Sequence, residues 1–186
     1  MLPKHQQASP EITRPVPLAY LITFTCYGTR LAGNESGSVD RKHNIPGTDF
    51  LPPNPRRVQG NMEQMRFPAY ELNLPQAHSV LKVIREVCAY RGWKLLAAHV
   101  RARHVHLVVA AKERPGKVMG HVKSYASRAL NREEQQVKPR WTHHGSTRYL
   151  WKSEQVYAAV QYVVHEQGEP MASWENPEGL ACLGSP

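Results

Sequence analysis

The order in which strand-like and helix-like patterns follow one another limits this chain to few folds. Side chains alternate between two faces in AYLITFTCYG near the start, which indicates a strand, and apolar residues recur at helical spacing in later segments. The predicted order is a strand up to Gly28, a long loop over 29–74, a helix from Pro75 to Gly92, strands over 94–101 and 103–111, a helix from Pro115, short strands on either side of Gly145, and a helix over 153–167.

That order is the split β-α-β pattern of a ferredoxin-like α+β fold. In such a fold an antiparallel sheet has its helices packed on one face, and the other face is partly free. With 186 residues the chain has room for one domain of ordinary size. We therefore expect a flexible arm over 1–17, one domain over 18–170 that includes the loop insertion 29–74, and a tail over 171–186.

Basic residues outnumber acidic ones in this chain. The 24 Lys and Arg residues against 15 Asp and Glu residues give a formal net charge of +9 and a pI of about 9.7. Such a surplus attracts polyanions and indicates nucleic acid or an anionic membrane face, although a protein that is merely basic and soluble is the alternative. No apolar run is long enough to span a bilayer and no secretory signal is visible, so we expect a cytoplasmic protein without membrane segments.

Two composition details refine this expectation. Cys26, Cys88 and Cys182 lie far apart without a CxxC spacing, which argues against a disulfide framework and against a zinc knuckle. The insertion 29–74 is long for a loop inside a compact domain, and such loops are more often functional than idle. Its basic residues are candidates for nucleic-acid contacts: Arg41, Lys42, Arg56 and Arg57.

Two histidines interrupt an otherwise aliphatic strand, RHVHLVVAA. His104 and His106 point to one face, while Val105, Leu107 and Val109 point to the other and belong against the helices. Same-face Cβ atoms two residues apart lie about 6 to 7 Å from each other, close enough for both rings to bind one metal ion. The alternative is two half-exposed polar residues on an edge strand.

Basic residues surround this strand and the next helix. They are the side chains that contact DNA phosphates, although a solvated basic face explains the helix residues equally well. The candidates for DNA binding are Arg101, Arg103, Lys112, Arg114, Lys117, Lys123, Arg128 and Arg132.

The last helix offers a nucleophile and a further ligand. Its buried stripe is predicted to contain Val156, Val160, Val163 and Val164. Tyr162 lies well off that stripe, and Glu166, one turn later, shares its face. The alternative is a boundary tyrosine beside a solvated glutamate. His165 and Gln167 are neighbours that can replace Glu166 as a ligand.

Other side chains are rivals or helpers. Tyr125 and Tyr157 are rival nucleophiles, although Tyr125 shares the apolar stripe of its helix. His143 and His144 are adjacent, and neighbours on a strand face opposite ways, so we expect them not to share an ion. Three aromatic side chains are candidates for stacking on unpaired bases, or else for filling the sheet edge: Trp141, Tyr149 and Trp151.

These motifs in combination resemble the HUH single-tyrosine transposases, including the REP-associated tyrosine transposases. The resemblance rests on the strand motif H-V-H, the helix motif Q-Y-V-V-H-E-Q, the Y-G-T turn after the first strand, and the segments KSYASRALNRE and RYLW. It covers most of residues 18–170. The resemblance implies a ferredoxin-like domain that binds single-stranded DNA with hairpin ends, often as a homodimer.

The resemblance also assigns roles to residues. It makes His104 and His106 metal ligands for Mg²⁺ or Mn²⁺, and Tyr162 the nucleophile that forms a covalent 5′-phosphotyrosine. The family's helix ligand, usually a glutamine or asparagine, falls on Glu166, and the nearest glutamine is Gln167. Two alternatives to this strand-transfer activity stay open: a hairpin-binding protein that has lost cleavage, and a nuclease that uses water instead of tyrosine.

Overall fold

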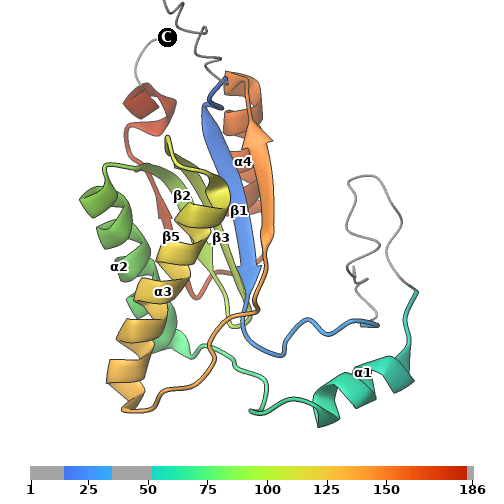
Figure 1. Cartoon of the computed structure of the whole chain (residues 1–186). Coiled ribbons are helices and arrows are strands. Elements are labelled where there is room, and N and C mark those ends of the chain that lie inside the picture. The colour runs from blue at the N-terminus through green and yellow to red at the C-terminus, as the bar shows by residue number, and fades with distance from the viewer. Residues whose placement is uncertain (1–14, 35–51, 184–186) are drawn as a thin grey trace, which may run out of the picture.

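A computed structural model describes residues 15–34 and 52–183 of the chain. They contain a five-stranded antiparallel sheet in the order β4-β1-β3-β2-β5 (Figure 1). The strands are β1 (Ala19–Thr25), β2 (Lys94–Val100), β3 (His104–Ala110), β4 (Ser146–Leu150) and β5 (Ala172–Glu175). The helices are α1 (Pro55–Glu63), α2 (Leu74–Arg91), α3 (Pro115–Glu134), α4 (Ser153–His165) and the 3-10 helix η1 (Gly179–Leu183).

The main core lies between the sheet and helices α2 and α3. Val105, Leu107 and Val109 on β3 point into it, as the alternation of the strand predicts. The two helices contribute apolar side chains at helical spacing, among them Ile84 and Val122. Helix α2 ends at Gly92, which takes the left-handed conformation (φ 67°) that favours glycine. The predicted ferredoxin-like α+β fold is confirmed.

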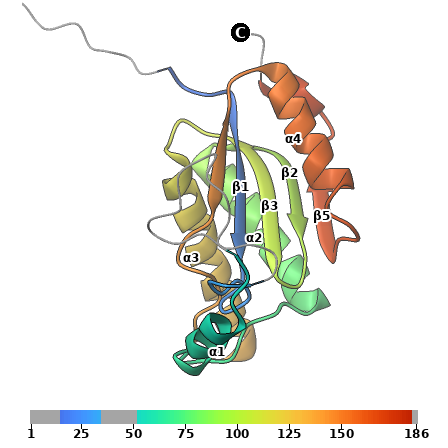
Figure 2. The ribbon, with the colours of Figure 1, turned by 90° about the vertical axis from the view of Figure 1, so that its right-hand side faces the viewer.

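Helix α4 lies on the opposite face of the sheet, so the expectation that all helices pack on one face is wrong for this element (Figure 2). Its buried residues pack on a second apolar cluster that includes Ala19, Leu96 and Val108. Val156, Val160 and Val163 form the buried stripe as predicted, and Val164 is only partly buried. The sheet face was not free because apolar side chains at one end of it need cover.

The insertion 29–74 was predicted to lack regular structure, but it contains helix α1 (Figure 1). The Asn54 side chain caps this helix by accepting from the backbone N–H of Arg57, and Pro55 occupies its first turn. No residue of α1 is buried, which explains why apolar periodicity did not reveal it. Arg56 and Arg57 lie in its first turn, whereas Arg41 and Lys42 lie outside the described residues.

The segment predicted to be a tail, 171–186, adds β5 and η1 to the domain. Strand β5 pairs with β2 from Ala172 to Glu175, and four residues are too few to show a clear alternation in the sequence. Of the predicted arm, residues 1–14 lie outside the described residues. Cys26 and Cys88 are buried and free, as expected for core residues, and the side chain of Cys182 lies outside the described part of the chain.

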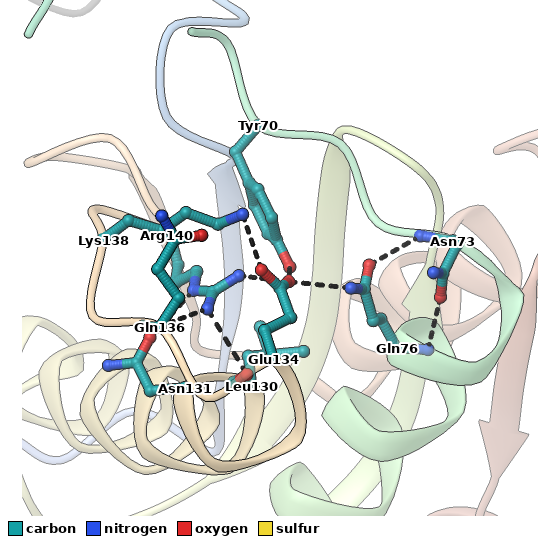
Figure 3. Close-up of polar contacts among 9 residues, drawn as sticks. All are labelled: Tyr70, Asn73, Gln76, Leu130, Asn131, Glu134, Gln136, Lys138 and Arg140. Atoms are coloured by element: carbon teal, nitrogen blue, oxygen red, sulfur yellow. Dashed lines mark hydrogen bonds and ion pairs between the residues drawn. The ribbon is translucent and has the colours of Figure 1, made fainter. Parts of the chain in front are cut away.

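A buried polar network ties the start of α2 to the end of α3 (Figure 3). Arg140 has a fully buried guanidinium that donates to the Glu134 carboxylate and to the backbone oxygens of Leu130 and Gln136. Glu134 also accepts from the Tyr70 hydroxyl at 2.7 Å. The remaining donors to this carboxylate are Gln76 at 2.8 Å and Lys138 at 2.6 Å. We call these residues the Arg140 network.

The charge of Glu134 follows from these contacts. Burial alone would raise the pKa of its carboxyl, but hydrogen bonds from Lys138, Tyr70 and Arg140 outweigh burial and lower the pKa to about 2. Glu134 is therefore ionised at neutral pH and pairs with the buried cation. Burying Arg140 is tolerated because its donors meet oxygen atoms.

Candidate active site

His104 and His106 lie on β3, the central strand of the sheet, and not on an edge strand. Their rings stack with centroids 6.2 Å apart and an angle of 19° between the planes. His106 is only 7% exposed, and His104 is half-buried at the start of the strand. The reading of the pair as ordinary polar residues of an edge strand is therefore wrong.

Tyr162 meets this pair from above the sheet. Helix α4 brings its ring to 6.4 Å from the ring of His106, edge to face at 83°, and leaves the side chain 40% exposed. The nucleophile predicted from the sequence and the two histidines thus converge within one chain. Tyr125 lies on α3, across the sheet from the histidines, and packs against the main core.

Thr23 on β1 orients the ring of His106. Its hydroxyl lies 3.0 Å from Nδ1 of His106, the residue directly opposite in the register. With Nδ1 engaged, Nε2 is the nitrogen left for a metal ion. Thr23 was not predicted as a site residue, although strand alternation places it on the face opposite Ile22 and Phe24.

Both imidazoles are kept neutral by their surroundings. Burial, followed by repulsion from His104, His99 and Arg101, lowers the pKa of His106 to about 4. Burial, together with nearby arginines of which Arg101 contributes most, also lowers the pKa of His104. Neutral imidazoles have free lone pairs at pH 7, which is the form that binds metal ions.

A third histidine, His99 on β2, joins the pair and was not anticipated. It lies directly opposite His106 in the register, and their rings are 6.4 Å apart at 83°. It is fully buried, and neither ring nitrogen makes a hydrogen bond of normal geometry. Burial lowers its pKa, while a contact with the backbone of Val163 acts in the opposite direction. The signal in the sequence was a single polar residue in the apolar strand KLLAAHV.

The candidate helix ligands do not close around the histidines. Glu166 and His165 are exposed at the end of α4, and the Gln167 amide donates to the backbone oxygen of Tyr162 at 3.3 Å. Within residues 15–34 and 52–183, no three His, Cys, Asp or Glu side chains are grouped as a metal site would require. The third ligand stays a prediction.

The basic residues predicted to bind DNA fall into two groups along β3. Arg101 lies at the histidine end, where its guanidinium donates to the backbone oxygen of Gln167 at 2.6 Å. Arg103 lies there too and pairs with Glu71, with its Nε 2.8 Å from the carboxylate. The second group lies beyond the other end of the strand and is exposed: Lys112, Arg114 and Lys117. Eight residues of strand separate Lys112 from His104, roughly 25 Å.

Lys123 on α3 has a structural role, because its ammonium group is not directed at solvent. Its ammonium donates to the backbone oxygens of Thr142 and His144 at 2.9 and 3.0 Å, and burial lowers its pKa to about 8. Arg128 and Arg132 on the same helix are exposed, and Arg128 packs over the ring of Tyr125.

The segment before β4 is a turn and not the strand that the sequence predicted. Because residues 142–145 are not extended in a ladder, the rings of His143 and His144 face each other, with Nδ1 and Nε2 3.2 Å apart. The expectation that they point in opposite directions is therefore wrong. Trp141 forms an isolated bridge to Cys26 and is largely buried.

A ferredoxin-like domain that brings two strand histidines and a helix tyrosine together has the arrangement of single-tyrosine transposases. The family described as IS200-like transposase matches residues 70–166, more than half of the chain, and the chain therefore belongs to this family. The matched span contains the histidine pair and Tyr162. It leaves out β1, which supplies Thr23.

Two solved structures that match this chain share little sequence with it. A REP-associated tyrosine transposase bound to a REP hairpin matches with a TM-score of 0.43 and 12% identity over 84% of this chain and 70% of that one. A candidate transposase from Deinococcus radiodurans R1 matches with a TM-score of 0.42 and 14% identity over 86% of this chain and 98% of that one. No curated protein sequence matches the chain. Among the helices of the described residues, none is long and apolar enough to cross a membrane.

Proposed function

We propose that this transposase-family protein cleaves and rejoins single-stranded DNA with hairpin ends, using Tyr162 as the nucleophile and a divalent metal ion. The observation that carries the proposal is the 6.4 Å ring contact between Tyr162 and His106, next to His104. Attack on a phosphodiester needs a nucleophile next to a metal ion. A phenol beside two neutral imidazoles can supply the nucleophile and two metal ligands.

Mg²⁺ or Mn²⁺ suits a phosphodiester substrate, and the two imidazoles favour Mn²⁺, because Mg²⁺ prefers oxygen ligands. His104 and His106 would hold the ion, because both imidazoles are neutral at pH 7. The hydroxyl of Thr23 engages Nδ1 of His106 and leaves Nε2 for the ion. When bound, such an ion neutralises charge on the non-bridging phosphate oxygens and orients the phosphorus. Glu166, Gln167 or His165 would supply the third ligand after a movement at the end of α4.

The proposed cleavage step is a transesterification that needs no nucleotide cofactor, because one phosphoester bond replaces another. The Tyr162 oxygen forms a bond to phosphorus while the bond from phosphorus to the 3′-oxygen breaks. The phenol loses a proton and the departing 3′-oxygen gains one. The products are a 5′-phosphotyrosine and a free 3′-hydroxyl, and attack by another 3′-hydroxyl reverses the step and joins two strands.

The exposed cations are suited to the DNA backbone. Arg101 lies between the histidines and the end of α4, where it can contact the phosphate that is cleaved. Arg128 and Arg132, with the exposed cations beyond the end of β3, can contact the hairpin stem, and a homodimer would bring two such surfaces to paired ends. Lys123 takes no part in this surface because backbone oxygens occupy its ammonium.

The test is formation of a covalent adduct between protein and DNA. Wild-type protein incubated with a labelled single-stranded hairpin oligonucleotide and Mn²⁺ is expected to give a labelled protein band in a denaturing gel. Tyr162→Phe and His104→Ala should abolish the band. Tyr157→Phe is the matched control, since Tyr157 is an exposed tyrosine on the same helix, and it should retain the band.

Hairpin binding without cleavage is the second candidate. It is favoured by the observation that, among the described residues, no third His, Cys, Asp or Glu side chain joins the histidine pair in a metal-binding group. It predicts tight DNA binding and no adduct in wild-type protein under any metal condition. Cleavage that persists in Tyr162→Phe would instead indicate a nuclease that activates water.

A further inference from the structure

Two large aromatic side chains, Tyr149 and Trp151, lie together on the surface at the β4 edge of the sheet. Tyr149 is 46% exposed and Trp151 is 47% exposed. Their rings are nearly parallel, with centroids 6.1 Å apart and 13° between the planes. Tyr149 belongs to β4, an edge strand, and Trp151 follows directly after it. We call this pair the aromatic platform.

The aromatic platform is fixed by its neighbours. Leu150, between the two residues, is buried, so the backbone is anchored in the domain. The ring of Tyr20 on β1 packs edge to face against Tyr149, with centroids 5.3 Å apart at 85°. The backbone N–H of Trp151 donates to Oε1 of Gln155 in α4 at 2.8 Å. A platform held in this way loses little conformational entropy when it binds a ligand.

Trp141, the third aromatic residue considered for stacking, belongs to the core instead. It is 9% exposed, packs edge to face on Phe24 at 5.1 Å, and donates its indole N–H to the backbone oxygen of Lys123. Burial leaves little of this ring exposed for a base to stack on. Of the three aromatic residues, Tyr149 and Trp151 are therefore exposed, and Trp141 is part of the core.

Exposed aromatic faces on a strongly basic chain match the chemistry of unpaired nucleobases. Every base has a flat face that stacks on an aromatic ring, and in a duplex those faces are covered by neighbouring base pairs. Lys152, next to Trp151 in the sequence, is exposed and can meet an adjoining phosphate. We propose that the aromatic platform stacks unpaired bases of single-stranded DNA, an inference that rests on the proposed function.

The platform is distant from the site of chemistry. Tyr149 pairs with Tyr20, whereas Thr23, which orients His106, lies three residues further along β1. Three residues of strand span about 10 Å and reverse the face to which a side chain points. A strand cleaved at Tyr162 would pass around the edge at β4 to reach the platform. The stacked bases are thus several nucleotides from the scissile phosphate.

Binding of two oligonucleotides of equal length tests the inference. One is a labelled thymidine strand, and the other has abasic positions that keep the phosphates and remove the bases. Full-length Trp151→Ala and Tyr149→Ala are expected to bind the thymidine strand about 5- to 150-fold more weakly than wild type, the effect of losing one stacked base. Their affinity for the abasic strand should equal that of wild type.

Two further variants calibrate the measurement. Trp151→Phe keeps a flat ring and should recover most of the affinity for the thymidine strand. Tyr90→Ala, on α2, removes a tyrosine that is 77% exposed and should change neither affinity. Circular dichroism of each variant confirms that the fold is retained.

Three results would overturn the inference. The first is wild-type affinity of both alanine variants for the thymidine strand. The second is an equal loss for both strands, which indicates a general effect on the surface. The third is a change in sedimentation with DNA binding unaltered, which indicates that the platform contacts a second copy of the chain.

The outcome is independent of the adduct experiment. If Tyr162→Phe still forms an adduct while the platform variants bind as expected here, the proposed nucleophile is wrong and the stacking contact stands. If the adduct depends on Tyr162 and the platform variants bind like wild type, only the platform is refuted.

Discussion

Two polar clusters inside this domain are built on opposite plans. The Arg140 network surrounds one carboxylate with four side-chain donors and directs a buried guanidinium at oxygen atoms (Figure 3). The histidine cluster on β2 and β3 has the hydroxyl of Thr23 against His106, while neither nitrogen of the buried His99 makes a hydrogen bond of normal geometry. Each cluster contains a side chain that is fully buried, Arg140 in one and His99 in the other. They differ in how many polar atoms are satisfied.

This difference separates a structural role from a chemical one. A saturated network stabilises the arrangement of the chain around it and has no capacity left for a ligand. An unsaturated cluster destabilises the folded domain, since buried nitrogens without partners have lost their contacts with water. Such a loss is expected where a ligand will later bind. The changes below either remove this contrast or measure it.

The largest effect is expected from Arg140→Met. The change leaves the Glu134 carboxylate without its buried cation, and breaking a buried pair on one side costs about 3 to 5 kcal/mol. Urea denaturation measures the loss. The double variant Arg140→Met with Glu134→Leu should recover part of it, because no uncompensated charge remains. Equal stability of the single and double variants would contradict this account.

The two clusters are also expected to respond to acid in different pH ranges. The folded pKa of His106, about 4, lies below its ordinary value of 6.5, so the unfolded chain takes up the proton first and stability falls between pH 6.5 and 4. The fall is about 2 to 3 kcal/mol. Glu134 has a folded pKa of about 2 against 4.5, so its contribution is complete above pH 4.5 and is lost towards pH 2. After solvent screening that contribution is about 1 to 2 kcal/mol.

Thermal melting at several pH values separates these ranges. His106→Asn should reduce the change between pH 6.5 and 4, to which the lowered pKa values of His99 and His104 also contribute, and Glu134→Gln should reduce the change below pH 4.5. If both variants flatten the same range, the assignment of the two pKa values is wrong.

A smaller effect is expected from Thr23→Val. The change keeps the shape of the side chain and removes the hydroxyl that holds Nδ1 of His106. Loss of a group that orients a metal ligand lowers metal affinity about 10- to 100-fold. Titration with Mn²⁺, followed by its electron paramagnetic resonance signal, measures the affinity. Leu21→Val, on the same strand and face, is the control and should leave the affinity unchanged.

The smallest effect is expected from His99→Leu, and its sign is opposite to that of Arg140→Met. The nitrogens of His99 make no hydrogen bond of normal geometry, so an apolar side chain in its place should raise the free energy of unfolding by about 1 kcal/mol. His99→Asn, which keeps buried polar atoms, should give no such gain. A loss of stability in His99→Leu would mean that the ring has a partner in solution.

Periodicity was enough to predict most of the fold. The face of His104 and His106 followed from alternation along β3, and the buried stripe of α4 followed from its valines. Periodicity failed where no side chain is buried, as in α1, and where a segment is too short to show a pattern, as in β5. It also does not determine on which face of the sheet a helix packs, and α4 was placed incorrectly for that reason.

The site was predicted only as far as residue types reveal it. The histidine pair and Tyr162 interrupt apolar patterns and were visible in the sequence. Thr23 and His99 depend on strand register, which brings them opposite His106 from positions remote along the chain. Lys123 was misread because a cation in the sequence does not show which backbone oxygens will surround it.

Gly145 determines how closely the segment before β4 approaches β1. A Cβ atom on this residue would sit 2.5 Å from the backbone oxygen of Thr23, so only glycine lets the turn approach β1 closely enough for Ser146 to pair there. From that point the chain runs through β4 into α4 and on to Tyr162. One inserted residue would reverse the faces of β4 or rotate the tyrosine by about 100°. The number of residues from Gly145 to Tyr162 therefore sets where the tyrosine ring lies relative to the histidine pair.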